Sequence, residues 1–136
     1  MRVFLTIFCL SPLFLVSGCG PGIRPNHFDT RTQEGTWDTD DVLFRAYPAS
    51  ELTYVQAVRA VEAFGKAQGW ADDGKDIEFR EAYIDFEDKD GNEIYFEVWG
   101  PAFGMIEIGV EFDDDSIRTV EILDAFEKTL KVKRLR

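Results

Sequence analysis

AYIDFEDKDGNEIYFEVWGPAFGMIEIGVEF, residues 82–112, is the stretch that decides the fold. It contains three runs, 82–87, 94–99 and 106–112, in which apolar side chains alternate with polar or aromatic ones. Alternation with a period of two residues is typical of strands that bury one face and expose the other to water. The stretch therefore predicts three antiparallel strands with one face against a core.

Two turns set the expected pairing of these strands. Residues 89–91, Lys-Asp-Gly, suit a three-residue hairpin whose glycine adopts the left-handed conformation, and Pro101 marks a second turn over residues 100–104. With these turns we expect Phe86 to pair with Ile94, and Val98 to pair with Ile106.

The flanking segments predict one more strand and two helices. Residues 42–47, closed by Pro48, are expected to form a short strand. Ser50 is the expected N-cap of a helix over residues 51–67 that ends at Gly69. Residues 113–116, Asp-Asp-Asp-Ser, are expected to cap a second helix. The expected buried stripes are Leu52, Val55, Val58, Val61 and Phe64 on the first helix, and Ile122, Leu123, Phe126 and Leu130 on the second.

The order of elements gives the fold class. Strand, helix, three strands and helix, β-α-β-β-β-α, predict an α+β two-layer sandwich. Its antiparallel sheet is expected to have three to four strands, with two helices packed on one face, because only the helices can cover the apolar side.

The N-terminus has the features of an export signal. Arg2 precedes an apolar run of fourteen residues, 3–16, which is too short to span a bilayer and has the length of a signal-peptide hydrophobic region. The following quartet, Val16-Ser17-Gly18-Cys19, resembles the lipobox of bacterial lipoprotein precursors. This resemblance implies that residues 1–18 are removed, that Cys19 carries the lipid, and that the mature chain is anchored in the bacterial cell envelope. Gly20 after the cysteine implies the outer membrane, facing the periplasm.

Composition divides the rest of the chain. Residues 19–41 are rich in small and polar residues, which predicts a lipidated cysteine followed by a flexible tether that contains His27, the only histidine. Residues 42–136 are predicted to form one small domain. Cys9 lies in the signal and Cys19 is the expected lipidation site, so no cysteine remains for a disulfide.

Charge restricts the partners. The whole chain has 15 basic and 26 acidic residues, a net charge of −11. Such acidity argues against nucleic acid and anionic lipid headgroups as ligands, since both would be repelled. Five basic residues fall within positions 128–136, where they are expected to complement the dipole at the end of the second helix.

Several short features resemble a family of small, uncharacterised bacterial lipoproteins, a domain of unknown function. They are the lipobox, the segment 45–48 (Arg-Ala-Tyr-Pro) before an alanine-rich helix, Gly69-Trp70 after it, Asp90-Gly91 in a hairpin, and Asp115-Ser116 before the last helix. The resemblance covers about residues 42–130 and implies the fold. It implies no reaction and no catalytic residue.

The water-facing side of the expected sheet offers one possible metal site. The expected register places Glu87, Glu93 and Glu111 in one row, and Tyr83, Glu97 and Glu107 in another. Three adjacent carboxylates could hold Ca²⁺ weakly or accept a basic segment, such as the protein's own C-terminal tail. The favoured interpretation is a solvated acidic face. The loop 88–92 does not fit a calcium-binding loop, because strands flank it and its spacing is wrong.

The same side offers a protein-contact patch. Trp99 and Met105 are expected to face outward, joined by Tyr83, Tyr95 and the acidic neighbour Glu97. Cover from the tether, with Trp37 folding back, fits equally well.

The predicted function is that of a membrane-anchored envelope lipoprotein, a non-enzymatic binding or structural module that contacts another envelope protein. The only histidine lies in the predicted tether and the one mature cysteine is expected to carry lipid, so the domain is expected to have no nucleophile activated by a histidine base. The alternatives are a Ca²⁺-binding module that uses the acidic face, and a carboxylate-based hydrolase. No cofactor is expected beyond the lipid on Cys19 and a weakly bound Ca²⁺.

Overall fold

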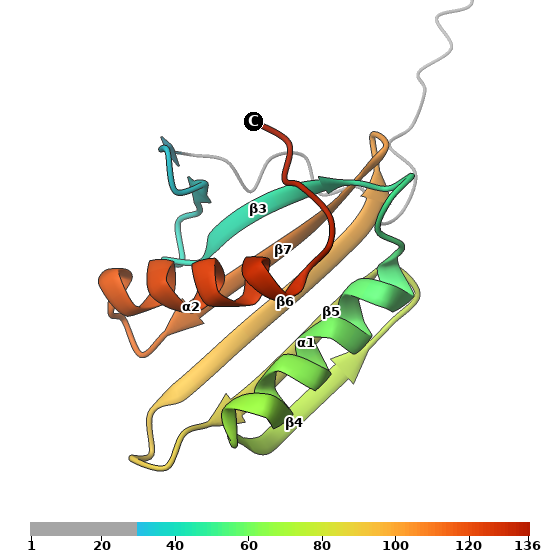
Figure 1. Ribbon diagram of the computed structural model, residues 1–136. Coiled ribbons are helices and arrows are strands. Elements are labelled where there is room, and N and C mark those ends of the chain that lie inside the picture. The colour runs from blue at the N-terminus through green and yellow to red at the C-terminus, as the bar shows by residue number, and fades with distance from the viewer. Residues whose placement is uncertain (1–29) are drawn as a thin grey trace, which may run out of the picture.

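The computed structural model describes residues 30–136, which form one antiparallel sheet and two helices (Figure 1). The sheet has seven strands in the order β1-β2-β3-β7-β6-β5-β4. The strands are β1 (Thr30–Arg31), β2 (Thr36–Trp37), β3 (Leu43–Pro48), β4 (Ala71–Ile77), β5 (Glu81–Glu87), β6 (Glu93–Ala102) and β7 (Met105–Phe112), and the helices are α1 (Tyr54–Gln68) and α2 (Ser116–Thr129).

The predicted number of strands is wrong, although the α+β class holds. Three strands were not expected: β1, β2 and β4. β1 and β2 have two residues each, too few to show an alternating pattern. β4 reads ADDGKDI and is mostly exposed, because it is an edge strand with only one neighbour and no buried face of its own.

β1 and β2 also correct the predicted tether. Residues 30–41 belong to the region expected to be flexible, yet they form a small hairpin paired with β3. The Asp38 side chain accepts hydrogen bonds from the backbone N–H groups of Asp40 and Val42, which holds the turn into β3. The signal, Cys19 and His27 lie outside the described residues.

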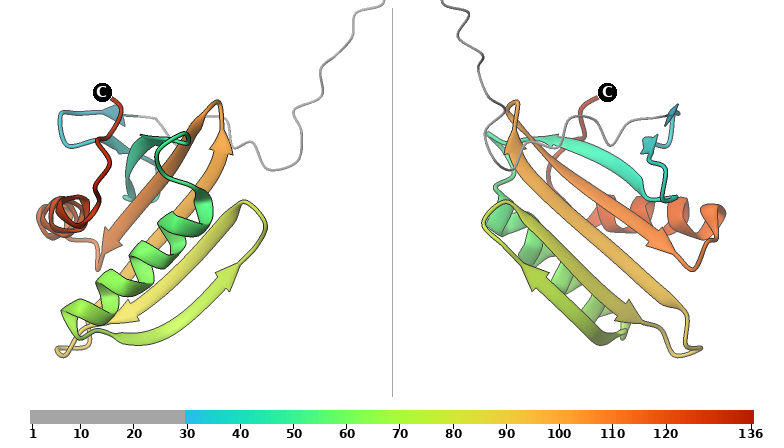
Figure 2. Two further views of the ribbon diagram at one scale, coloured as in Figure 1. Left: turned by 45° about the vertical axis from the view of Figure 1, so that its right-hand side comes forward. Right: turned by 180° about the vertical axis from the view of Figure 1, so that it is seen from behind.

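Both helices lie on one face of the sheet, and the opposite face carries no helix among residues 30–136 (Figure 2). The core between the two layers contains Val61 and Phe64 of α1, Leu123 and Phe126 of α2, and the apolar residues of β5, β6 and β7. No helix in this part of the chain is long and apolar enough to cross a membrane.

The start of α1 differs from the expected one. Thr53, not Ser50, is the N-cap, and it forms a capping box in which its side chain and that of Gln56 each bond the other's backbone N–H. Val55, expected in the buried stripe, is 53% exposed because the three-residue spacing of that stripe departs from the 3.6-residue period of the helix, which turns Val55 away from the buried face. Gly69 ends the helix in the left-handed conformation (φ 77°), as predicted.

Register is correct at the first hairpin and wrong at the second. Phe86 pairs with Ile94, as expected. Val98 pairs with Ile108 instead of Ile106, because the turn is a tight one at Phe103 and Gly104, both with positive φ, and the register shifts between Trp99 and Ala102. Within that irregularity, the Gly100 N–H donates to the Arg80 carbonyl in the β4–β5 turn (2.9 Å).

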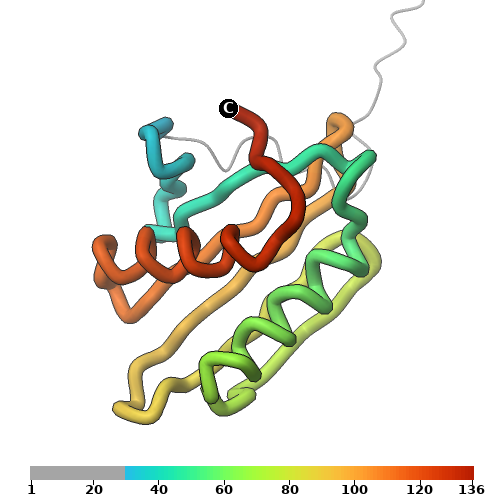
Figure 3. The backbone as a smooth tube through the Cα atoms, in the orientation of Figure 1, coloured from blue at the N-terminus to red at the C-terminus, as the bar shows by residue number. Residues whose placement is uncertain are grey.

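The C-terminal tail, residues 130–136, leaves α2 and crosses to the outer edge of β3 (Figure 3). The backbone N–H of Leu135 donates to the Ala46 carbonyl (2.8 Å). β2 pairs with β3 only at Leu43 and Phe44, so the tail contacts a part of the edge that β2 leaves uncovered. The hairpin and the tail thus lie at two points along the same strand edge.

Candidate functional site

A cleft of about 600 Å³ lies beside β3, between the β1–β2 hairpin and the C-terminal tail. Its lining brings together residues from four segments of the chain: the hairpin, β3, the start of β7 and the tail. The lining residues are Arg31, Thr32, Gln33, Gly35, Thr36, Phe44, Arg45, Ala46, Met105, Arg134, Leu135 and Arg136. Four arginines therefore meet at one cleft in an acidic protein.

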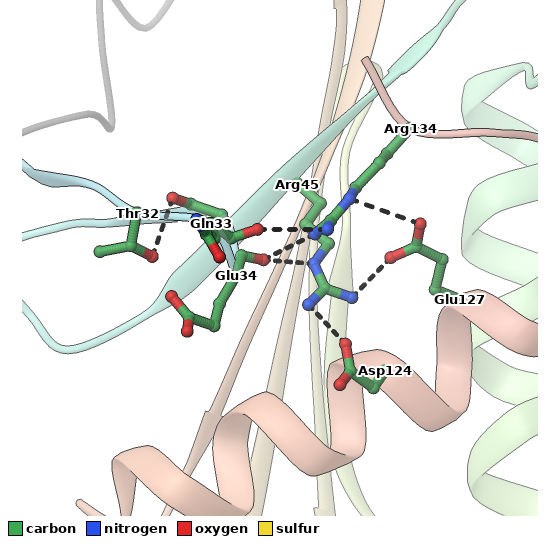
Figure 4. Close-up of polar contacts among 8 residues, drawn as sticks. Thr32, Gln33, Glu34, Arg45, Asp124, Glu127 and Arg134 are labelled. Carbon is green, nitrogen blue, oxygen red and sulfur yellow. Dashed lines mark hydrogen bonds and ion pairs between the residues drawn. The ribbon is translucent and has the colours of Figure 1, made fainter. Parts of the chain in front are cut away.

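Arg45 ties two of the surrounding segments to β3. Its side chain is 2% exposed and forms ion pairs with Asp124 (2.6 Å) and Glu127 (2.5 Å) of α2. Its Nε donates to the backbone carbonyl of Glu34 in the β1–β2 loop (2.5 Å; Figure 4). The planar guanidinium suits this arrangement, because its donors point in several fixed directions.

Arg134 adds the tail to the same network. Its guanidinium donates to the carbonyls of Glu34 (2.8 Å) and Gln33 (3.2 Å), and its Nε lies 3.7 Å from a Glu127 oxygen. In Figure 4 the two arginines lie side by side between the loop and α2. Loop, strand, helix and tail are therefore held together by two guanidinium groups.

The loop is itself well ordered. The Thr32 N–H donates to the Gly35 carbonyl (2.7 Å), and Gly35 lies so close to β3 that a Cβ there would meet the Phe44 carbonyl oxygen at 2.5 Å. A hydrogen bond from the Thr32 side chain is the main cause that lowers the pKa of Glu34. Glu34 is therefore charged at neutral pH, with its side chain in solvent.

The other two arginines of the cleft, unlike Arg45 and Arg134, have no carboxylate partner among residues 30–136. Arg31 and Arg136 are exposed, and neither forms an ion pair with a residue between 30 and 136. Asp124 and Glu127, by contrast, balance Arg45 and Arg134. The cleft therefore has two positive side chains available to an anionic ligand.

The predicted protein-contact patch forms only in part. Tyr83 stacks on Tyr95 (6.1 Å between ring centroids) and meets Trp99 edge-on (5.7 Å). The Trp99 Nε1 donates to Glu97 (2.6 Å), and the Tyr95 hydroxyl donates to the same carboxylate. Met105 lines the cleft instead.

These aromatic residues are less exposed than expected. Trp99 is 5% exposed and Glu97 6%, whereas both were expected on a water-facing surface. Trp99 belongs to a second, smaller core with Val42 and Phe44, against which Tyr83 and Tyr95 pack. Burial and the neighbouring Glu97 raise the pKa of the Tyr95 hydroxyl. The patch therefore helps to build the open face of the sheet.

The predicted carboxylate rows are not formed. Glu87 and Glu93 do face each other, but the shifted register puts Glu111 opposite Tyr95. No group of three side chains among residues 30–136 is arranged to hold a metal ion. Desolvation, followed by Asp114 and Asp41, raises the pKa of Glu111.

The second row is also corrected. Tyr83 and Glu97 are paired as expected, but the next position along the row is Gly109, and Glu107 lies opposite Trp99. Burial raises the pKa of the Glu107 carboxyl.

Sequence reasoning missed the cleft. Arg45 stands at an inward position of β3, between Leu43 and Tyr47, where an apolar residue would be usual. A buried charge requires ionic partners, so an arginine at an inward strand position was the feature of the sequence that could have indicated this site. The basic C-terminus was attributed to the helix dipole, which does not account for Arg134 contacting a loop a hundred residues earlier in the chain.

Comparison with protein-family models and with curated proteins finds no match to this chain. The resemblance to small bacterial lipoproteins therefore stays a prediction, and the function has to be argued from the geometry.

Proposed function

We propose that this protein is a lipid-anchored, non-enzymatic binding module of the bacterial cell envelope, and that the cleft beside β3 contacts another envelope protein. The lipobox sequence at residues 16–19 supports the anchor, and the arginine-lined cleft supports binding. The cleft carries the proposal because it gathers charge and apolar surface in one concave place.

The cleft is also preorganised. Arg45 and Arg134 connect the β1–β2 loop, β3, α2 and the tail before any ligand arrives. A site whose walls are already fixed loses little conformational entropy on binding. This favours a recognition role for a domain of modest size.

Site-specific crosslinking in cells tests the contact site. A photo-crosslinking amino acid at Gln33, which lines the cleft, should form a discrete adduct with an envelope protein. The same amino acid at Gln68, an exposed glutamine at the end of α1, is the matched control and should not. Adducts of equal yield at both positions, or at neither, would contradict the proposal.

The anchor has its own test. Cys19→Ser should abolish labelling by radioactive palmitate and move the protein out of the membrane fraction, because three acyl chains hold a protein on a bilayer almost irreversibly. Cys9→Ser is the matched control, since Cys9 lies within the predicted signal and should leave labelling unchanged. Membrane association that persists in Cys19→Ser would remove the anchor from the proposal.

A further inference from the structure

The unbalanced arginines of the cleft point to the chemistry of the bound segment. We infer that the cleft binds an extended, acidic peptide segment of the partner, an inference that rests on the proposed function in taking the cleft as the contact site. The segment's carboxylates pair with Arg31 and Arg136, and its apolar side chains contact Met105 and Leu135.

Charge complementarity is the first argument. The whole chain has a net charge of −11, so most of its surface repels an acidic segment. At the cleft the carboxylates of Asp124 and Glu127 are already paired with Arg45 and Arg134, and this leaves Arg31 and Arg136 to act on the ligand. The exposed carboxylate of Glu34 in the neighbouring loop opposes them, but its side chain is not part of the cleft lining. The cleft is thus a region of the surface that attracts an acidic ligand.

Shape and lining are the second argument. The cleft lies beside β3 and is bounded by the hairpin, which pairs with Phe44, and by the tail, which bonds Ala46, so a narrow, extended chain segment fits between these two walls. Met105 and Leu135 add apolar lining that a peptide with alternating side chains can contact. An inorganic phosphate could not use this apolar surface.

The state of Arg45 argues against a small anion as the natural ligand. Phosphate sites have converging donors that are free to bind. Arg45 is the most deeply buried of the four arginines in the cleft, and its guanidinium already contacts Glu34, Asp124 and Glu127. The remaining charge is carried by exposed side chains, which match dispersed carboxylates better than one compact group.

The experiment measures peptide binding by fluorescence anisotropy, with the full chain in detergent micelles. The probe is a fluorescein-labelled peptide of alternating glutamate and valine, and peptides of alternating glutamine and valine or lysine and valine are the comparisons. We expect saturable binding of the glutamate peptide only, weakened by added salt. Arg31→Glu and Arg136→Glu should each weaken it roughly fivefold, as loss of an exposed ion pair predicts.

The control variant is Arg59→Glu, which makes the same charge change on the exposed side of α1 and should leave binding unaltered. All variants should keep the wild-type melting temperature, because neither Arg31 nor Arg136 is buried. Equal weakening by Arg59→Glu, or equal binding of the glutamine peptide, would overturn the inference. Polyphosphate that displaces the glutamate peptide and binds with the same affinity as that peptide would also overturn the inference, since the cleft would then attract any polyanion.

The outcomes separate this inference from the proposed function. Crosslinking at Gln33 that succeeds while no acidic peptide binds would keep the contact site and overturn the acidic ligand. Acidic peptide binding that depends on Arg31 and Arg136, with no adduct at Gln33 in cells, would support the chemistry of the cleft and contradict the envelope partner.

Discussion

The two faces of the sheet bury different kinds of residue. The helix-covered face packs aliphatic and phenylalanine side chains, such as Ile84 and Phe96, against α1 and α2. The open face has no helix among residues 30–136, yet Phe44 and Trp99 are almost fully buried there. Each face also buries one ionisable side chain, Arg45 on the first and Glu97 on the second.

The difference teaches that alternation predicts which side of a strand a residue occupies and does not predict how exposed that side is. Glu97 and Trp99 occupy the side expected from the sequence, but aromatic rings cover them. The buried ionisable group of each face is tolerated because Arg45 is ion-paired and Glu97 is hydrogen-bonded. The open face is thus a second core with polar members.

Arg45→Met tests the buried charge of the helix face and should have the largest effect. It leaves Asp124 without its partner and Glu127 with only the longer contact to Arg134, and it removes the hydrogen bond to the Glu34 carbonyl. Breaking a buried pair from one side costs about 3 to 5 kcal/mol, and the partial exposure of Asp124 reduces this to about 3 kcal/mol here. Urea denaturation measures the loss.

Two variants sharpen this result. Arg45→Lys keeps the charge but cannot reach three acceptors, so it should recover less than half of the lost stability. Arg118→Met removes an exposed ion pair with Glu121 on the same helix and should cost at most about 0.5 kcal/mol. Equal losses for Arg45→Met and Arg118→Met would mean that burial of Arg45 contributes nothing.

Gly109→Ala tests whether the open face is packed as a core. A Cβ at this position would meet the Phe44 ring at 2.5 Å and Val42 at 2.8 Å, so the neighbours must move. Overpacking of this kind costs about 2 kcal/mol. Thermal denaturation of the variant checks it, and an unchanged melting temperature would mean that the face is loose enough to absorb a methyl group.

Gly65→Ala is the matching substitution on the other face. Its Cβ would contact the Phe86 ring, but α1 gains helix propensity of about 1 kcal/mol, which offsets part of the strain. We expect a smaller loss than for Gly109→Ala. A larger loss for Gly65→Ala would show that the helix face is the less tolerant of the two.

Much of the fold could be predicted because the central strands and both helices have clear periods. β5 and β7 alternate over their whole length, β6 alternates as far as Trp99, and α2 has its expected cap at Asp115. β4 could not be found, since an edge strand such as Ala71–Ile77 needs no apolar side. The register of β6 and β7 depends on which residues form the turn. A shift of two residues keeps apolar side chains opposite apolar ones, so the alternating pattern cannot reveal it.

The site was harder to predict, because its parts are far apart in the sequence. Arg45 and Arg134 were both noted, but only the folded chain brings them to the Glu34 carbonyl. The aromatic cluster was predicted with mostly correct members, since Tyr83, Tyr95, Glu97 and Trp99 follow from the first hairpin alone. Its burial could not be predicted, because Phe44 comes from β3.

Glu97→Gln tests the buried carboxyl group of the open face. The carboxyl oxygens accept hydrogen bonds from Trp99 and Tyr95, and the glutamine amide replaces one acceptor oxygen by an NH2 group that cannot accept. We expect a loss of about 1 kcal/mol and a change in tryptophan fluorescence. Glu87→Gln, at an exposed position of the same face, is the matched control and should change neither.

Glu107→Gln should have the smallest effect, with a sign that depends on pH. Burial raises the pKa of Glu107 in the folded state above its usual value, so its contribution to stability is complete below the unfolded pKa and is lost as pH rises through the folded pKa. Near pH 7 the glutamine variant should therefore be more stable by less than about 1 kcal/mol, because solvent screens a half-buried group. The difference should vanish by about pH 3.5, where the carboxyl is neutral in both states. Urea denaturation at the two pH values measures this difference in the free energy of unfolding. A difference that stays constant would mean that Glu107 is solvated like any surface carboxylate. The open face would then be wetter around Glu107 than its burial indicates.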